Sequence, residues 1–422
     1  MQSDVENYCC GIDFGTSNST VCLATERAHF LAAVENSDDT IPSAMFFNFA
    51  TGHPAFGREA IRDYMAGESG RFMRALKSVI GRPIFHEKTK IGKRYATLAD
   101  ILGLFLQHLK RKAEAEADRD LDSVVLGRPV QFIENAPEAD RQAQSDLEQA
   151  ARKIGFKNIE FQFEPIAAAL EYETSTTGEQ VVLIVDIGGG TSDFSIVRVS
   201  PERIKQADRS ADILANRGIR VGGTDFDRQL STGQIMPHFG RGTLYGSKKL
   251  EMPKAIYWDL STWSNINAVY EHKVLTMLRA LRKEAQSPAL LDRLLSVIES
   301  RSGHRLISDI ERAKIALSSE TAARLDLGYV ESGFAVSVGR DAFVASIAEL
   351  LTRIETCIGA TVADAGLSPD KINTVFLTGG SSMALPVQAL VRAMFAEATI
   401  TSGDVFGAVG KGLGLDARRK FS

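Results

Sequence analysis

The sequence lacks the segments that would carry a chain into or across a membrane. Its first residues, Met1-Gln2-Ser3-Asp4-Val5-Glu6, contain neither the basic nor the apolar part of a signal peptide. No apolar run approaches the roughly 20 residues that span a bilayer. The net charge of −4 gives no general attraction to nucleic acid or to anionic lipid. We therefore expect a cytoplasmic protein that binds neither nucleic acid nor membranes.

Cysteine is scarce, and its four positions form no metal or redox pattern. Cys9, Cys10, Cys22 and Cys357 include no CxxC pair and no Cys/His cluster. The first three lie in apolar runs, which is typical of small buried side chains. We predict a reduced protein in which these three thiols are buried. The chain of 422 residues has room for two or three domains, at about 100–200 residues each.

One unit occurs twice in the sequence: an apolar strand that ends in Asp, a glycine turn and a return strand. The first copy covers residues 8–24 and the second covers residues 181–199. Two apolar runs around a Gly-containing turn predict a β-hairpin. A repeat at this distance predicts two related lobes rather than a short-period solenoid.

Both turns offer the hydrogen-bond donors that a phosphate chain needs. Backbone N–H groups approach an anion closely where no Cβ blocks the way, and Thr or Ser hydroxyls add donors. Strand rather than helix follows these glycines, so neither turn matches the dinucleotide fingerprint or the Walker loop. A single glycine-rich hairpin is more often just a turn, but two copies with an adjacent Asp favour a phosphate clamp. Its donors would be Gly15, Thr16, Ser17, Asn18, Gly188, Gly189, Gly190 and Thr191.

Three carboxylates frame the two turns. Asp13, Asp186 and Asp193 lie at the strand ends. Mg²⁺ prefers oxygen ligands and keeps several waters, so these side chains are suited to orient a hydrated Mg²⁺ and an attacking water. An isolated Asp at such a place is more often a cap of the strand end. Three of them around two glycine turns favour the ion.

Five further residues are ambiguous when taken one at a time. Lys77 is placed to neutralise charge that develops on a γ-phosphate, and Glu164 lies between a strand and a helix. Glu311, Lys314 and Ser318 fall on one face of an amphipathic helix, where they could hydrogen-bond a ribose and a base edge. The alternative for each is a solvated surface side chain.

Together, five ordered segments resemble the nucleotide-binding domain of the Hsp70 chaperones, within the actin-like ATPase superfamily. The resemblance spans nearly the whole chain, which makes it far more specific than any one motif. The segments are 11–19 and 186–193 for the phosphate motifs, 164–169 for the first connecting helix, 379–382 with Pro386 for the adenosine motif, and 404–410 for the second connecting helix. Residues 127–130, 221–227 and 314–319 bring the pattern closest to short bacterial Hsp70-like proteins of the YegD type.

This resemblance implies an α/β fold of the actin/Hsp70 type, with two lobes that each hold a ribonuclease H-like mixed sheet flanked by helices. ATP or ADP, with Mg²⁺, would lie in the central cleft. The implied catalytic residues are Lys77, Glu164, Asp186, Thr191 and Asp13, and the implied metal contacts, mostly through water, are Asp13, Asp186 and Asp193. Besides the two turns, the nucleotide would contact Gly222, Gly223, Glu311, Lys314, Ile315, Ser318, Gly379, Gly380, Ser381 and Asp404. Pro129 and Arg141 match a proline and an arginine that relay the nucleotide state between the lobes in that family.

The resemblance also implies a division of the chain. We predict lobe I over residues 1–180, lobe II over residues 181–400 with a helical upper part at about 225–320, and a helix over 401–422 that returns to lobe I.

Three departures from the family pattern bear on function. Ile315 stands where an adenine-stacking arginine is usual, and Met383 and Ala384 occupy the stretch that usually holds a second arginine. Apolar Ile315 can still pack against a base. The sequence stops about where the ATPase domain stops, so we expect no peptide-binding domain.

The resemblance favours a slow Mg²⁺-dependent ATPase whose hydrolysis is coupled to lobe closure. Its partners would be a nucleotide and a protein client or co-chaperone, in a chaperone or partner-regulating role. Two alternatives use the same fold, because fold does not fix function. One is a sugar or small-molecule kinase, and the other is an actin-like filament protein gated by nucleotide.

Residues 240–305 are the least readable part of the sequence and are expected to be mostly helical. They contain Trp258 and Trp263, near Tyr257 and Met252. These side chains would form either a partner surface or part of the lobe core, and the core is favoured because aromatic residues are usually buried.

Overall fold

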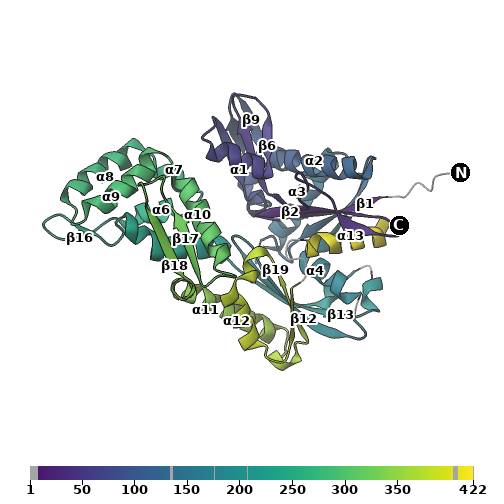
Figure 1. Ribbon diagram of the computed structural model, residues 1–422. Coiled ribbons are helices and arrows are strands. Elements are labelled where there is room, and N and C mark those ends of the chain that lie inside the picture. Colours follow the sequence, from purple (N-terminus) through teal and green to yellow (C-terminus); the bar gives the residue numbers. More distant parts are fainter. Residues whose placement is uncertain (1–7, 134–135, 175, 207, 403–406, 422) are drawn as a thin grey trace.

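Two β-sheets form the frame of the molecule (Figure 1), and we call the parts built on them lobe I and lobe II. The computed structural model describes residues 8–133, 136–174, 176–206, 208–402 and 407–421. The sheet of lobe I has the order β11-β10-β1-β2-β3 with β4 paired to β2, and that of lobe II has the order β14-β13-β12-β19-β20. The strands of lobe I are β1 (Cys9–Phe14), β2 (Asn18–Ala24), β3 (His29–Leu31), β4 (Ile41–Pro42), β10 (Ser123–Arg128) and β11 (Asn158–Phe163). Those of lobe II are β12 (Gln180–Ile187), β13 (Ser192–Val199), β14 (Ile213–Ile219), β19 (Thr374–Thr378) and β20 (Thr399–Ser402).

The two hairpins predicted from the glycine turns are present. β1 pairs antiparallel with β2, and β12 pairs antiparallel with β13. Each inner strand also has a parallel neighbour, β10 beside β1 and β19 beside β12. Because helices cover these sheets, the strands read as continuous apolar runs rather than alternating ones. The register of the second hairpin sets Asp186 directly opposite Asp193.

Two helices, α4 (Glu164–Glu173) and α13 (Ala408–Phe421), lie between the two sheets (Figure 1). Their backbones approach so closely that a Cβ on Gly412 would lie 1.8 Å from the carbonyl oxygen of Ala167. Leu413 and the apolar side chains of α4 join strands of both sheets, including Val125 and Val182, in one hydrophobic cluster. The two lobes therefore share a core at the base of the molecule.

Lobe I carries a smaller sheet, β6-β5-β7, with α1 packed on it. Helices α2 and α3 contact each other and strands of the main sheet. The bounds are β5 (Ala44–Asn48), β6 (Pro54–Phe56), α1 (Gly57–Met65), β7 (Gly70–Arg74), β8 (Lys88–Ile91), β9 (Arg94–Thr97), α2 (Leu98–Ala117) and α3 (Pro137–Lys153). A 3₁₀ turn, Leu76–Val79, follows β7.

Lobe II carries a mostly helical upper part, which Figure 1 shows on the far side of the molecule from the two termini. It consists of α5 (Gly223–Leu230), β15 (Leu244–Tyr245), β16 (Leu250–Glu251), α6 (Lys254–Leu260), α7 (Ile266–Val269), α8 (His272–Glu284), α9 (Pro288–Glu299), α10 (Gly303–Ala316), β17 (Ala322–Asp326) and β18 (Ala335–Gly339). Helices α11 (Arg340–Asp364) and α12 (Leu385–Met394) pack beside each other near the main sheet. Residues 240–305 are thus mostly helical, as expected, apart from the β15–β16 hairpin.

The prediction that the tryptophans of residues 240–305 are buried in the lobe core is wrong for one of the two. Trp258 is 46 % exposed, while Tyr257 beside it and Met252 are buried. Successive residues of a helix point in different directions, so α6 turns Tyr257 inward and Trp258 outward. The guanidinium of Arg228 lies 4.3 Å from the ring centre of Trp258. Trp263 is partly buried and faces lobe I, as described below.

The prediction of buried thiols is confirmed. Cys9, Cys10, Cys22 and also Cys357 are buried and form no disulfide. In the part of the chain that the structure describes, no helix combines the length and the apolar character needed to cross a membrane.

The close approach of α13 to α4 generates a stability prediction. Gly412→Ala is expected to destabilise the protein by about 1–3 kcal/mol, because the added Cβ collides with backbone that cannot move aside. Gly359→Ala is the matched control, since Gly359 is exposed in helix α11 with open space where its Cβ would be. The control is expected to stabilise by up to about 1 kcal/mol. Urea unfolding of both variants measures the difference, and similar midpoints would contradict the prediction.

Candidate functional site

The two glycine turns meet across the boundary between the lobes. A Cβ on Gly189 of lobe II would lie 2.3 Å from Oγ of Ser17 in lobe I. A third glycine segment backs the second turn, because a Cβ on Gly222 would lie 2.6 Å from the carbonyl of Gly189. The N–H of Gly223 donates to the carbonyl of Gly188 at 2.9 Å. Side chains larger than glycine would push these segments apart.

Serine side chains hold the first turn in its shape. Ser43 Oγ donates to the carbonyl of Gly15 at 2.7 Å, and the N–H of Ser43 donates to the carbonyl of Ser17 at 2.8 Å. Ser43 Oγ also lies 2.8 Å from Ser19 Oγ. The turn's own side chains keep partial exposure, and so do Gly188 and Gly189. Ser43 was not singled out from the sequence, where it follows a short strand and matches no motif.

Lys77 and Glu164 form an ion pair beside the turns. Lys77 Nζ lies 2.5 Å from Glu164 Oε1, and the two side chains are 13 % and 15 % exposed. Lys77 comes from the 3₁₀ turn Leu76–Val79, and Ala75 enters this turn in the left-handed conformation with φ 57°. Glu164 is the first residue of α4, where the helix N-terminus favours a carboxylate. The fold therefore joins two residues that are ambiguous in the sequence.

Asp13 and Asp186 add negative charge to this buried place. Burial, and secondly the charge of Glu164, raises the pKa of Asp13 to about 7. Burial, and secondly the charge of Asp193, raises the pKa of Asp186 to about 7. Burial by itself lowers the pKa of Lys77, but Glu164 and Asp13 more than offset it, so this pKa lies above its ordinary value. One lysine thus faces several carboxylates.

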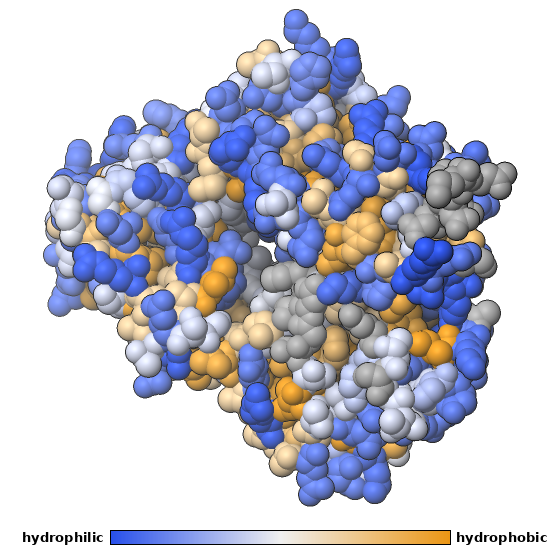
Figure 2. Space-filling model, turned by 45° about the vertical axis from the view of Figure 1, so that its right-hand side comes forward, coloured by the Kyte–Doolittle hydropathy of each residue, from blue (hydrophilic) through white to orange (hydrophobic). Residues whose placement is uncertain are grey.

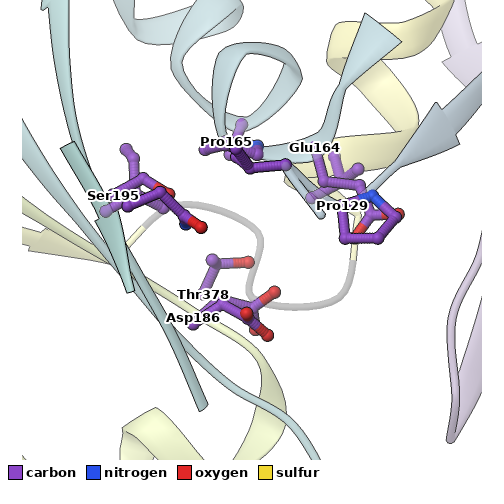
Figure 3. A pocket seen from close by; sticks show the side chains of 12 residues that line it. Pro129, Glu164, Pro165, Asp186, Ser195 and Thr378 are labelled. Atoms are coloured by element: carbon purple, nitrogen blue, oxygen red, sulfur yellow. The ribbon is translucent and has the colours of Figure 1, made fainter. Parts of the chain in front are cut away.

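A small cavity lies among these residues (Figure 3). Its volume is about 20 Å³, which is room for about one water molecule. Glu164 and Asp186 line it together with Pro129 and Thr378, and Figure 3 shows these side chains around one hollow. The cavity places a water-sized space in contact with the carboxylate cluster.

On the other side of the turns, Lys314 reaches α5. Its Nζ lies 2.9 Å from Asp227 Oδ1 and donates to the carbonyl of Gly223 at 3.4 Å. Burial raises the pKa of Asp227 to about 6, although Lys314 opposes the shift. A Cβ on Gly223 would lie 2.2 Å from Ser381 Oγ, which shows how closely the adenosine motif packs on this segment.

Gly379 connects the adenosine motif to the carboxylates. It has φ +76°, and a Cβ there would lie 2.3 Å from Asp186 Oδ1. Gly380 follows it at the start of a 3₁₀ turn. The structure therefore brings Gly222, Gly223, Lys314, Gly379, Gly380 and Ser381 into one neighbourhood with the two turns.

The remaining members of the predicted set differ in their placement. Glu311 and Ile315 are exposed on α10, and Ile315 has 60 % of its surface accessible. Ser318 does not share a continuous helix with them, because α10 ends at Ala316 and Ser318 lies in the turn that follows. Asp404 lies outside the described residues. Asp227 lies in the segment 221–227 but was assigned no role, because its pairing with Lys314 is created by the fold and has no signal in the sequence.

The upper parts of the lobes touch above the cleft, through a set that we call the upper contact: Tyr64, Phe72, Trp263 and His304. Tyr64 Oη lies 2.9 Å from His304 Nε2. The ring of Trp263 lies 6.1 Å from that of Tyr64 and 5.9 Å from that of Phe72. Figure 2 shows the hollow that separates the lobes where they do not touch. No pattern in the sequence indicated that these four residues meet.

A family model described as Hsp70 protein matches residues 9–243 and 279–417. These ranges cover most of the chain and contain both glycine turns, the Lys77–Glu164 pair and the adenosine motif. The unmatched residues between them include Trp258 and Trp263. Together with the two mixed sheets, this match confirms the expected two-lobed α/β fold of the actin/Hsp70-like ATPases.

The crowded carboxylates generate a prediction about pH and stability. Because the folded-state pKa of Asp186 lies above its unfolded value, ionisation of this group opposes folding, and its contribution to stability is lost as the pH rises from about 4 to about 7. Asp186→Asn removes this charge, so it is expected to stabilise the metal-free protein at pH 8, with a smaller gain at pH 5.

Chemical unfolding at the two pH values without divalent ions measures the effect. Asp39→Asn, at an exposed loop position, is the control and is expected to change little at either pH. Equal effects of the two substitutions would show that ionisation of Asp186 does not destabilise the folded protein.

Proposed function

The chain belongs to the Hsp70 family and is an ATP-binding protein of that family, and from this premise we propose that it is a slow Mg²⁺-dependent ATPase. The single observation that carries the proposal is the meeting of the two glycine turns beside the Lys77–Glu164 pair. A triphosphate held by both turns would have its γ-phosphate next to this pair.

The two turns would hold the phosphates from opposite sides. Thr16, Ser17 and Asn18 would contact them from lobe I, and Gly188 to Thr191 would contact them from lobe II. This fits the structure because the glycines leave the backbone N–H groups unobstructed. A side chain at Gly189 would separate the turns, because its Cβ would lie 2.3 Å from Ser17 Oγ.

The carboxylates fit a cation that is held mainly through water. Among the described residues, no three His, Cys, Asp or Glu side chains converge as direct ligands of a metal. Mg²⁺ commonly keeps several waters and binds the phosphates themselves. Asp13, Asp186 and Asp193 would orient that hydrated ion, whose charge supports the developing negative charge on phosphate. The raised pKa values of Asp13 and Asp186 fit such a site, because a nearby cation would favour the ionised carboxylates that burial, and secondly neighbouring negative charge, disfavour.

Hydrolysis would depend on the groups around the small cavity. Lys77 would stabilise the charge that develops on the γ-phosphate, and Glu164 holds Lys77 in place. Asp186 and Thr191 would orient the attacking water. The cavity of about 20 Å³ supports this arrangement because it offers space for one water beside Glu164 and Asp186.

The nucleoside would lie against α10 and the adenosine motif. Lys314, Glu311 and Ser318 would contact the ribose and base edge, and Gly379 to Ser381 would contact the other face. Ile315 is an exposed apolar side chain on α10, which suits packing against a base where the family pattern has arginine.

Closure of the lobes is the proposed output of hydrolysis. A ligand shifts a two-state equilibrium only through different contacts in the two states, and a γ-phosphate that touches both turns supplies this difference. We propose that closure serves a chaperone or partner-regulating role toward a protein client or co-chaperone. The upper contact would secure the closed arrangement.

Lys77→Ala is expected to lower ATP hydrolysis by about 100-fold or more, because a positioned charge is lost from the reacting phosphate. Binding of ADP should change little, because ADP has no γ-phosphate for Lys77 to contact. Single-turnover hydrolysis and calorimetry with ADP measure the two effects. Lys248→Ala, an exposed lysine between β15 and β16, is the control and should match wild type.

The same assays separate the alternative functions. Wild-type protein that neither binds ATP nor hydrolyses it with Mg²⁺ would contradict the proposal. Turnover that depends on one added sugar or other small substrate would indicate a kinase. Nucleotide-dependent pelleting of the purified protein would indicate a filament.

The upper contact should slow nucleotide release. Tyr64→Phe removes the hydrogen bond to His304, and Trp263→Ala removes the ring that packs on Tyr64 and Phe72. Each substitution is expected to speed dissociation of a fluorescent ADP analogue several-fold in stopped-flow measurements. Tyr95→Phe, at a residue that is 67 % exposed, is the control. Unchanged dissociation in both variants would show that the upper contact does not limit release.

A further inference from the structure

Arg128 is the last residue of β10 and makes an unusually complete set of contacts. Its Nε donates to the carbonyl of Pro129 at 3.1 Å, and its Nη2 donates to the carbonyl of Val130 at 3.2 Å. From helix α3, Asp140 accepts from Nη2 at 2.7 Å and Gln144 accepts from Nη1. The side chain is only 12 % exposed.

Two aromatic rings enclose the same guanidinium. Its carbon lies 5.3 Å from the ring centre of Phe132 and 5.2 Å from that of Phe163, within the range of cation–π attraction. Asp140 also accepts a hydrogen bond from the backbone N–H of Phe132 at 2.5 Å. Arg128 therefore fixes the turn at residues 129–132 against α3 and against the end of β11.

The groups that Arg128 fixes belong to the wall of the site. Pro129 and Val130 line the small cavity together with Glu164 and Asp186. Phe163 is the N-cap residue of α4 and directly precedes Glu164. On the other side of Arg128, a Cβ on Gly127 would lie 3.4 Å from Cγ of Glu164. The residues next to Arg128, both in sequence and in space, thus surround Glu164, which forms the ion pair with Lys77.

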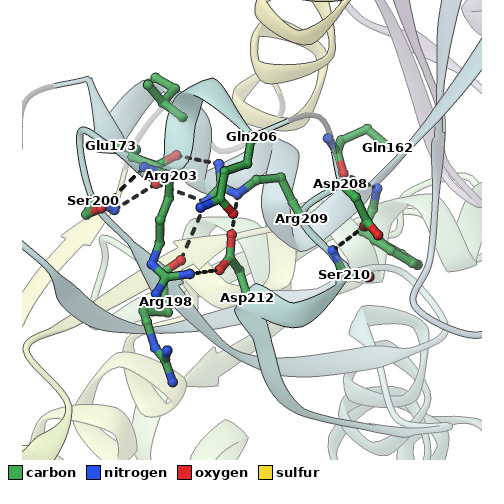
Figure 4. Close-up of polar contacts among 12 residues, drawn as sticks. Gln162, Glu173, Arg198, Ser200, Arg203, Gln206, Asp208, Arg209, Ser210 and Asp212 are labelled. Atoms are coloured by element: carbon green, nitrogen blue, oxygen red, sulfur yellow. Dashed lines mark hydrogen bonds and ion pairs between the residues drawn. The ribbon is translucent and has the colours of Figure 1, made fainter.

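Arg128 also faces a second cavity, of about 140 Å³, between the lobes. The opposite wall includes Asp208 and Arg209 of lobe II, and Arg209 is fixed in a buried ion network with Glu173 and Asp212 (Figure 4). Glu173 is the last residue of α4, so this wall is tied to the same helix that begins at Glu164.

The family resemblance pointed to Arg141 as the arginine that works with Pro129. Arg141 is exposed on α3, whereas Arg128 contacts the carbonyl of Pro129 directly. Lysine in place of Arg128 would keep the charge, but one ammonium cannot reproduce a planar fork with several donors between two rings.

Building on the proposed ATPase function, we propose that Arg128 is a positioning residue for hydrolysis: it holds Pro129 and Glu164 in the arrangement that sets the Lys77–Glu164 pair against the γ-phosphate. It touches neither nucleotide nor metal and acts through the turn and the start of α4. Small displacements of a reacting geometry are costly, up to about 100-fold for 1 Å.

The test compares Arg128→Lys with Arg152→Lys in the full chain. Arg152 is a surface arginine that also bonds a carboxylate, that of Glu148, and a backbone carbonyl, that of Lys157, but far from the carboxylate cluster. Arg128→Lys is expected to lower kcat for Mg-ATP about tenfold and to leave KM and the ADP affinity within about twofold. Arg152→Lys is expected to match wild type.

A purely structural role for Arg128 would lower the thermal midpoint and the amount of active protein, without this split between kcat and KM. The proposal is overturned if kcat per active site is unchanged in Arg128→Lys, or if Arg141→Lys lowers it and Arg128→Lys does not. If Arg128→Lys does not fold, Asp140→Asn removes one anchor of the guanidinium, and an unchanged kcat there overturns the proposal. Inactive wild-type protein would instead refute the proposed ATPase, so the two failures are distinguishable.

Discussion

Close packing at glycines, where a Cβ would collide with a neighbouring segment, is the constraint on which this molecule depends. At the base, Gly412 of α13 lies against the carbonyl of Ala167 in α4. At the site, Gly189 lies against Ser17 and Gly222 lies against Gly189. Both sets of contacts cross between elements that come from distant parts of the chain. They place the two hairpins near enough to act on one ligand, which neither hairpin could enclose alone.

The same closeness forces negative groups together in a buried place. Asp13 and Asp186 come from the two equivalent hairpins. The contact between the hairpins therefore also brings these two carboxylates close together. Burial first, and neighbouring negative charge second, raise the pKa values of both aspartates, and Lys77 offsets only part of this shift. A buried group of carboxylates gains most from a ligand that brings cations, and this is the physical reason for which the proposed closure would depend on the bound ligand.

The sequence predicted the elements whose signals are local. Both hairpins and the buried thiols follow from apolar runs and from glycines at fixed offsets. The family match also agrees with the order of the motifs along the chain, while the closer likeness to YegD-type proteins stays a prediction. Lys77 and Glu164 were candidates only by resemblance, because 87 positions separate them and only the fold creates their 2.5 Å contact.

Other features had no local signal at all. Ser43, Asp227 and Arg128 are single polar residues whose partners lie in other elements, and one sequence does not reveal such pairings. Trp258 was predicted wrongly because a short helix such as α6 buries one aromatic residue, Tyr257, and exposes the next. The general tendency of aromatic residues to be buried does not tell which of the two faces solvent. The upper contact joins residues 64 and 72 to residues 263 and 304, so it is a property of lobe arrangement rather than of any segment.

The positions of these contacts imply how motion is distributed. The shared core of α4 and α13 joins both sheets at the base, so the proposed closure would move the lobes most at the top, where the upper contact lies, and least near α4. Glu164 begins α4 and therefore sits close to the part that moves least. In the proposed mechanism, the Lys77–Glu164 pair would therefore keep its geometry while the upper parts separate. Arg128 packs beside the start of α4 and faces Asp208 and Arg209 across the second cavity, so the proposed positioning of Glu164 would act through the part of the molecule that joins both lobes.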